Sequence, residues 1–152
     1  MGTFRLTIEI DRPAADVFAF IAEPRNMTLW YEAVNQVDEI APRTPAHAAT
    51  FRITRSLAGQ QADNVVEVTE STPSVAVSFE SREGPTPFHY RYTIEPNGER
   101  SLLTLDADIS STGLPGPLAH LDRIATRAFE QGMRQNLEGL KHLVESDALA
   151  SG

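Results

Sequence analysis

Four histidines are the residues of this sequence best suited to holding a metal. They lie far apart, at His47, His89, His120 and His142, and no two have the i, i+4 helical spacing or the carboxylate neighbour of a metal motif. The sequence also has no cysteine, which excludes thiolate zinc sites, thiol nucleophiles and disulfides. We therefore predict no metal site.

The glycines and serines give no sign of phosphate binding or of hydrolysis. Gly59, Gly84 and Gly98 stand singly in expected turns, so the sequence has no glycine-rich phosphate loop. It also lacks the nucleophile elbow of the serine hydrolases. We accordingly expect no cofactor.

Polar side chains at inward-facing strand positions are better candidates for a site. Tyr90 and Tyr92 alternate along their strand in step with apolar residues and are therefore expected to face inward. Each buried hydroxyl needs a hydrogen-bond partner, which would be either a ligand or, as in an ordinary core, backbone or water. Arg55 and Ser81 have the same parity but lie near strand ends, where we expect exposure at the rim. Trp30 would either cover one end of a cavity or anchor short helices.

The segment AFEQGMRQNLEGL, residues 128–140, has helical periodicity but places unusual residues on its inward face. At about 100° per residue, that face is centred on Leu118, Asp122, Ala125, Phe129, Gly132, Met133, Asn136, Leu140 and Leu143. A glycine inside a helix costs about 1 kcal/mol relative to alanine. Gly132 therefore indicates either a close approach of helix and sheet or, as we favour, room for a ligand. Asn136 would contact that ligand, or form a structural bond to sheet backbone or a buried water.

The elements that carry these residues follow from hydrophobic periodicity. Alternation in residues 4–10 predicts a strand, and the segment that follows predicts a short helix with Pro13 in its first turn and Pro24 at its end. A second short helix is expected over residues 26–30. Apolar residues spaced by three in residues 34–40 are ambiguous, and we expect a strand only in their second half.

Residues 48–111 predict an antiparallel meander, because the turn signals between its apolar runs leave no room for crossover helices. A helix of roughly 40 Å is expected over residues 118–145. His89 alternates with inward residues and is expected to face solvent. The inward positions of the meander are Phe51, Ile53, Val66, Val68, Val75, Val77, Phe79, Phe88, Tyr90, Tyr92, Ile94, Leu103, Leu105, Ala107 and Ile109.

Composition and charge limit the function classes. The 152 residues are 41% hydrophobic and 22% charged, as expected of one folded domain, which we place at residues 1–146 with a tail at 147–152. The net charge of -8 disfavours nucleic acid and anionic membrane surfaces as partners. No basic leader or membrane span is evident, so we expect a cytoplasmic protein that is a monomer or homodimer.

Long stretches of the sequence resemble a known superfamily. IEIDRPAADVFAFIAEPRNMTLWYEAV, TESTPSVAVSFES, EPNGERSLLTLDADI and MRQNLEGLKHLVES are similar to segments of the START-like helix-grip superfamily, also called SRPBCC, in its polyketide cyclase/dehydrase branch. The resemblance implies an α+β helix-grip fold, in which a curved antiparallel β-sheet wraps around a long C-terminal α-helix, with two short helices after the first strand. It also implies a cavity between sheet and helix.

The expected function is therefore the binding of a small apolar or aromatic molecule, such as a lipid or polyketide, in that cavity. One alternative is a polyketide cyclase/dehydratase-like enzyme acting in the same cavity, and another is a protein-interaction module of the chaperone-activator type. The residues expected to contact the ligand are Trp30, Phe51, Ile53, Val66, Val68, Val77, Phe79, Tyr90, Tyr92, Leu103, Leu105, Ala125, Phe129, Gly132, Met133 and Asn136.

Overall fold

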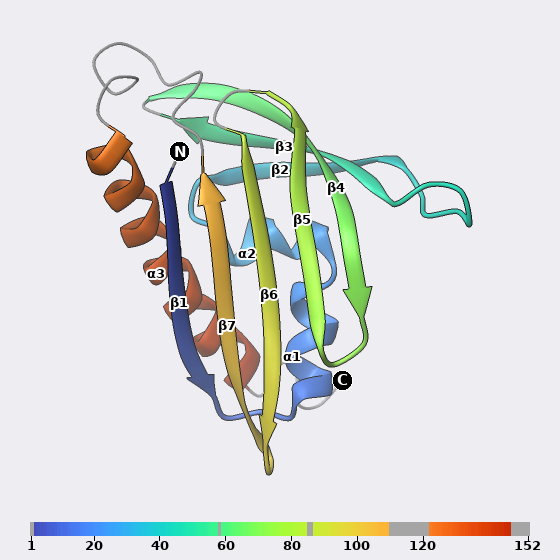
Figure 1. Ribbon diagram of the computed structural model, residues 1–152, viewed down its shortest axis with the longest axis vertical. Helices are drawn as coiled ribbons and strands as arrows, with labels where there is room; N and C mark the ends of the chain where they lie inside the picture. The colour runs from blue at the N-terminus through green and yellow to red at the C-terminus, as the bar shows by residue number, and fades with distance from the viewer. Residues whose placement is uncertain (1, 58, 85–86, 110–121, 147–152) are drawn as a thin grey trace.

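The computed structural model describes residues 2–57, 59–84, 87–109 and 122–146 (Figure 1). Seven antiparallel strands form one sheet in the order β1-β7-β6-β5-β4-β3-β2. Their bounds are β1 Gly2–Ile10, β2 Val34–Ala41, β3 Thr50–Leu57, β4 Gln60–Thr72, β5 Ala76–Glu83, β6 Phe88–Asn97 and β7 Arg100–Ile109. The predicted meander is thus confirmed, and β1 extends it by pairing with β7.

The helices pack on the concave side of this curved sheet. Between β1 and β2 lie α1 (Ala14–Ile21), the 3₁₀ turn η1 (Pro24–Asn26) and α2 (Met27–Trp30), and the chain ends in α3 (Asp122–Glu145) (Figure 1). The predicted helices before β2 are therefore present, with Pro13 at the start of α1 and Pro24 opening η1. No helix in the described part of the chain is long and apolar enough to span a membrane.

The strand β2 is longer than the sequence predicts. It covers all of Val34–Ala41, and its pairing with β3 shifts register after Val34 and again after Glu39. The first of these shifts explains why Val34 and Val37, although three residues apart, both face the core. Two residues also point away from the core: Ile40, and Val75, which was predicted to face inward but lies in the β4–β5 turn beside Ser74 with its φ of 63°.

The face of α3 that packs on the sheet is rotated from the predicted one. Met133, Leu137, Leu140 and Val144 are buried, whereas Phe129 and Leu143 are half-buried and Gly132 is exposed. The predicted face included Gly132 and Leu143 and omitted Leu137 and Val144, because small and polar residues obscured the apolar spacing. Residues 118 and 120 and the side chains at 122 and 125 lie outside the described part of the structure.

Polar contacts fix the C-terminal end of α3 to the end of β1. Lys141 donates from Nζ to the backbone carbonyl of Glu9 at 2.8 Å and to Oε2 of Glu145 at 2.7 Å. The same Glu145 oxygen accepts the backbone N–H of Asp11 at 2.7 Å. These bonds lower the pKa of the Glu145 carboxyl, that from Lys141 most of all. This end of the helix is therefore held against the sheet.

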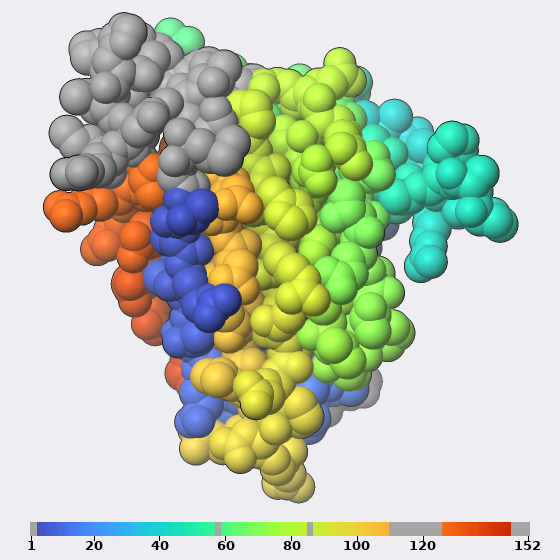
Figure 2. Space-filling model, in the orientation of Figure 1, coloured from blue at the N-terminus to red at the C-terminus, as the bar shows by residue number. Residues whose placement is uncertain are grey.

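The convex side of the sheet carries charges instead of an apolar surface. Arg5 pairs with Asp106, Arg82 with Glu67 and Arg91 with Glu70. Figure 2 shows these strands side by side, with the β2–β3 connection, residues 42–49, projecting beyond them. His89 lies half-buried on this side, in the outward register that alternation predicts.

Candidate functional site

A cavity of about 270 Å³ lies between α3 and the sheet. Its wall comes from four parts of the chain: α2 with the segment leading into β2, the second half of β3, the start of β6 and the middle of α3. The lining residues are Met27, Tyr31, Glu32, Ala33, Val34, Ile53, Arg55, Phe88, Tyr90, Ala128, Phe129, Gly132, Met133 and Asn136. The wall is mostly apolar.

The residues expected to contact a ligand fall into distinct places. Ile53, Tyr90, Phe129, Gly132, Met133 and Asn136 line the cavity. Phe51 and Val68 line a separate surface groove of about 470 Å³ beside residues 43–49. The side chain of Ala125 lies outside the described residues. The remaining residues lie in the core away from the cavity lining: Trp30, Val66, Val77, Phe79, Tyr92, Leu103 and Leu105.

Several lining residues were not among the expected contacts. Tyr31, Glu32 and Ala33 join α2 to β2, where no periodicity identifies an inward position. Arg55 and Phe88 were both predicted at inward-facing strand positions but were not included among the expected ligand contacts. The expectation that Arg55 is exposed at the rim is wrong, since only 8% of it is exposed.

Arg55 places a positive charge in the cavity wall. Its Nε–H donates to Oδ1 of Asn64 at 2.9 Å, and its guanidinium carbon lies 5.4 Å from the centre of the Phe88 ring. Burial lowers the pKa of the Arg55 guanidinium, an effect that Tyr90 opposes. An arginine nevertheless remains protonated at neutral pH, so the wall is cationic here.

Tyr90 lies in the wall near this charge. Its ring packs against that of Phe88, with centres 4.6 Å apart. Burial raises the pKa of the Tyr90 hydroxyl to about 12, although Arg55 acts in the opposite direction. The hydroxyl is therefore a neutral hydrogen-bond donor and acceptor at any physiological pH.

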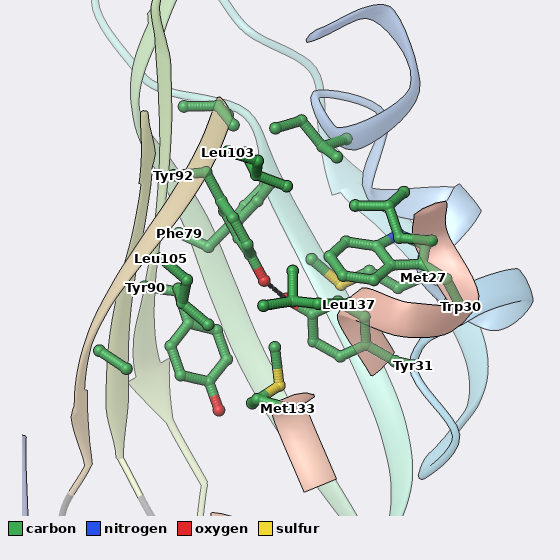
Figure 3. Packing of buried hydrophobic residues seen from close by; sticks show 14 of the residues in the cluster. Met27, Trp30, Tyr31, Phe79, Tyr90, Tyr92, Leu103, Leu105, Met133 and Leu137 are labelled. Atoms are coloured by element: carbon green, nitrogen blue, oxygen red, sulfur yellow. Dashed lines mark hydrogen bonds between the residues drawn. The ribbon is translucent and has the colours of Figure 1, made fainter. Parts of the chain in front are cut away.

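The other two tyrosines bond to each other deeper in the core. The hydroxyl groups of Tyr31 and Tyr92 form a hydrogen bond (Figure 3). Trp30 packs edge-on against both rings, with centres 4.4 Å and 5.8 Å away. Tyr92 thus has the protein partner that the sequence left open, and Trp30 acts as a packing anchor between the short helices and the sheet. Its indole Nε1 has no hydrogen-bond partner in the described part of the chain.

Asn136 forms a structural bond across the cavity edge. Its Oδ1 accepts the backbone N–H of Glu32 at 3.0 Å, and its Nδ2 donates to the sulfur of Met133 at 3.3 Å. The sequence left open a ligand contact or a bond to sheet backbone. The oxygen is used by backbone just before β2, so Asn136 ties α3 to the segment that forms one side of the cavity.

Gly132 borders open space. A Cβ built on it would have no atom of the described residues within 4 Å, apart from its own helix and chain neighbours. The alternative interpretation, a close approach of helix and sheet at this glycine, is therefore wrong. The missing side chain leaves volume at the cavity instead.

The sequence matches the family described as "Polyketide cyclase / dehydrase and lipid transport" over residues 1–145. The chain belongs to this family. Comparison with curated proteins gave no match. Within the described residues, no group of three or more potential metal ligands comes together.

Solved structures with the same fold include proteins of several kinds. The Zhui aromatase/cyclase from a Streptomyces species is 16% identical over 99% of this chain and 98% of its own, with a TM-score of 0.78. A START superfamily protein from Mycobacterium smegmatis is 16% identical over 94% of this chain and 97% of its own, also at 0.78. The di-domain ARO/CYC BexL is 24% identical over 95% of this chain but 47% of its own, at 0.71. At these identities the likenesses establish the helix-grip fold.

The burial of every tyrosine in this family member predicts an unusual alkaline titration. The chain has three tyrosines, and burial raises the pKa of each. A free tyrosine ionises near pH 10. The tyrosinate absorbance should therefore rise through pH 10 in the denatured chain, whereas the folded protein should show none at that pH. Because the folded pKa values are raised, the associated stability is complete below about pH 10, and the part that comes from Tyr90 is lost as the pH rises through about 12. Ionisation of any tyrosine near pH 10 in the folded state would contradict its burial.

The open space at Gly132 predicts that a small side chain is tolerated there. Gly132→Ala should raise the free energy of unfolding by up to about 1 kcal/mol, because alanine has the higher helix propensity. Gly139→Ala is the matched control, since it lies in the same helix and its Cβ also meets nothing within 4 Å. Urea unfolding measures both. A loss of about 1–3 kcal/mol at Gly132 alone would indicate overpacking against the sheet.

Proposed function

We propose that the protein binds a small aromatic or otherwise apolar molecule that carries an acidic or carbonyl oxygen, in the cavity between α3 and the sheet. The observation that carries this proposal is the wall itself, in which apolar side chains surround the buried guanidinium of Arg55. Ligand pockets are typically apolar, with a small number of polar groups that orient the ligand.

The volume of the cavity supports a ligand of about two fused rings. An apolar cavity of about 150 Å³ accommodates benzene, and this cavity has about 270 Å³. A fatty acid or a longer polyketide would have to extend beyond these walls.

The position of Arg55 supports an oxygen-bearing ligand. A charge interacts more strongly across the low effective dielectric of a protein interior than in water. An anionic or carbonyl oxygen placed against the guanidinium would form a charge-assisted hydrogen bond, which is about twice as strong as a neutral one. The family description, which names polyketides and lipids, supports the same chemical class.

Binding is tested by thermal unfolding with 2-naphthoate, its methyl ester, myristate and an aromatic polyketide. A ligand at about 100 times its dissociation constant should add about 2.7 kcal/mol, which corresponds to a rise in Tm on the order of 5–10 °C for a domain of this size. Gly132→Leu should reduce the rise by occupying the cavity, whereas Gly139→Ala should leave it unchanged. If no compound in the panel shifts the Tm, the binding proposal fails.

Catalysis of ring closure is a second candidate, favoured by the presence of both Arg55 and Tyr90 in one apolar wall. A guanidinium and a neutral hydroxyl can polarise a ketone carbonyl, and a confining cavity can hold a poly-β-ketone chain in a folded conformation. Here Arg55 would stabilise the developing enolate oxygen, and Tyr90 would exchange a proton with a carbonyl oxygen.

The test incubates a reactive poly-β-ketone with the wild-type protein and with Tyr90→Phe, and compares the cyclised products. Catalysis predicts a changed product ratio with the wild type and a roughly tenfold or greater loss of that effect in the variant. The variant should still bind 2-naphthoate, because it keeps the ring and the neighbouring guanidinium. Identical products with and without protein would leave binding as the function.

We do not extend the proposal to a protein-interaction module. The convex face carries ion pairs such as Arg5–Asp106 and Arg91–Glu70, which are typical of a solvated surface. Among the described residues, the exposed large apolar side chains are Leu29, Ile40 and Val75, which come from α2, β2 and the β4–β5 turn.

A further inference from the structure

The hydroxyl of Tyr90 is a buried polar group of the cavity wall that forms no hydrogen bond with any described residue. Only 4% of Tyr90 is exposed, and the residue lines the cavity. Other buried polar groups of the wall are used within the protein, since Tyr31 bonds to Tyr92 and Oδ1 of Asn136 accepts the backbone N–H of Glu32. Buried hydroxyl groups are almost always hydrogen-bonded, so we expect the partner of Tyr90 among the molecules that occupy the cavity.

Ring contacts fix the direction of the Tyr90 side chain. Its ring centre lies 4.6 Å from that of Phe88 and 6.4 Å from that of Tyr31. Figure 3 shows its hydroxyl pointing away from the bond between Tyr31 and Tyr92, on the side where Met133 lies. A tyrosine has only two side-chain torsions. These contacts therefore leave the hydroxyl little freedom to turn toward another group of the protein.

The neutrality of this hydroxyl limits what can bind to it. Burial raises the pKa of Tyr90 to about 12, so the group is not ionised at neutral pH. A neutral hydroxyl can donate to a carbonyl oxygen or accept from another hydroxyl, and neither bond needs a charge on the ligand. An alkyl chain offers no donor or acceptor. It would leave the Tyr90 hydroxyl buried without a partner.

The lining around Tyr90 favours an aromatic ring over a flexible chain. Tyr31, Phe88, Tyr90 and Phe129 all line the cavity. Aromatic rings pack favourably on one another in offset or edge-on contacts. Among these four residues, Tyr90 is the one whose hydroxyl is not already bonded within the described part of the protein.

We propose that Tyr90 is a specificity-determining residue, whose hydroxyl bonds to a neutral oxygen, a ketone carbonyl or a phenol hydroxyl, carried by an aromatic ligand. This inference rests on the proposed binding function and narrows it. Oxygenated aromatic molecules are preferred over hydrocarbons and lipid chains of similar size, and the preference does not depend on the charge of Arg55.

The test compares 2-acetonaphthone with 2-isopropenylnaphthalene, two molecules of nearly equal shape that differ by a carbonyl oxygen in place of a methylene group. Calorimetry gives the ratio of the dissociation constant of the alkene to that of the ketone. Tyr90→Phe should lower this ratio about three- to tenfold, as expected for the loss of one neutral hydrogen bond. Comparing the ratios of wild type and variant cancels the different hydration of the two probes.

Tyr92→Phe is the matched control. It removes a hydroxyl from the same strand and the same face, two residues from Tyr90, but that hydroxyl is bonded to Tyr31 and the residue does not line the cavity. The ratio of the two dissociation constants should therefore equal that of the wild type. A fall in the ratio as large as that in Tyr90→Phe would overturn the assignment to Tyr90.

The free protein provides a readout that needs no ligand. Tyr90→Phe should leave the Tm unchanged or raise it, because it removes a hydroxyl that has no partner in the protein. Tyr92→Phe should lower the Tm on the order of 3–8 °C, because it leaves the Tyr31 hydroxyl buried without its partner. An equal fall in both variants would show that the protein itself uses the Tyr90 hydroxyl, and would overturn the inference.

The failure of this inference can be told apart from the failure of the binding proposal. An unchanged ratio in Tyr90→Phe, with both probes still bound, would overturn the inference and leave binding intact. Binding of 2-naphthoate without binding of either neutral probe would do the same. If the wild type binds none of the three compounds, the binding proposal fails and the inference fails with it.

Discussion

The packing of α3 on the concave face of the sheet is the interaction on which the rest of the structure depends. The last turns of the helix bring Leu137, Leu140 and Val144 into the core, and its C-terminal end is bonded to the end of β1 through Lys141 and Glu145. The preceding turns carry Ala128, Phe129 and Gly132 on the side that faces the cavity. The cavity therefore lies beside turns of the helix that include two small residues, Ala128 and Gly132.

Polar groups beside the cavity bond within the protein. Tyr31 and Tyr92 share one hydrogen bond, and Asn136 bonds to the backbone of Glu32. A buried hydroxyl or amide without a partner costs about 1–3 kcal/mol, so these pairings stabilise a boundary between the filled core and the cavity. Arg55 is another polar residue of the wall, and its Nε–H donates to Oδ1 of Asn64.

Most of the fold could be predicted because each strand buries only one of its faces, so apolar and polar residues alternate along it in the sequence. Phe88, Tyr90 and Tyr92 alternate with half-buried polar residues, and single glycines such as Gly98 mark the turns. The pattern was less informative where the pairing is irregular. Two register shifts in β2 disturb its alternation, and the rotation of α3 was misjudged because Gly132 and Asn136 carry no hydrophobic signal. Sequence periodicity thus predicts the presence and type of a regular element better than its irregular pairing or its rotation.

The candidate site could be predicted only in part, because it is made where elements meet. The alternation of apolar residues along the strands identified Ile53 and Tyr90. Tyr31, Glu32 and Ala33 lie in the connection between α2 and β2, where the sequence has no hydrophobic periodicity that would predict a cavity position. The surroundings of Arg55 depend on strand pairing. Asn64 on β4 and Ser81 on β5 are distant from Arg55 in sequence, yet the pairing of β3, β4 and β5 brings the three residues together in the sheet. Alternation along one strand predicts which face a side chain lies on. Its neighbours on that face follow only from the pairing register of the adjacent strands.

The residues that pack α3 on the sheet are separate from those that shape the cavity, so substitutions can alter ligand binding and fold stability separately. The residues that stabilise α3 on the sheet, Leu137, Leu140 and Val144, are not among those that line the cavity. Substitutions at Ala128 or Gly132 therefore alter the shape of the cavity without removing the contacts that these three residues make. Substitutions at distant sites with no shared partners are usually additive in their effect on stability, so the cavity and the fold can vary largely independently of each other. Arg55 is the exception, because its orientation is built from three strands of the sheet, and a change of its charge is also a change of the core.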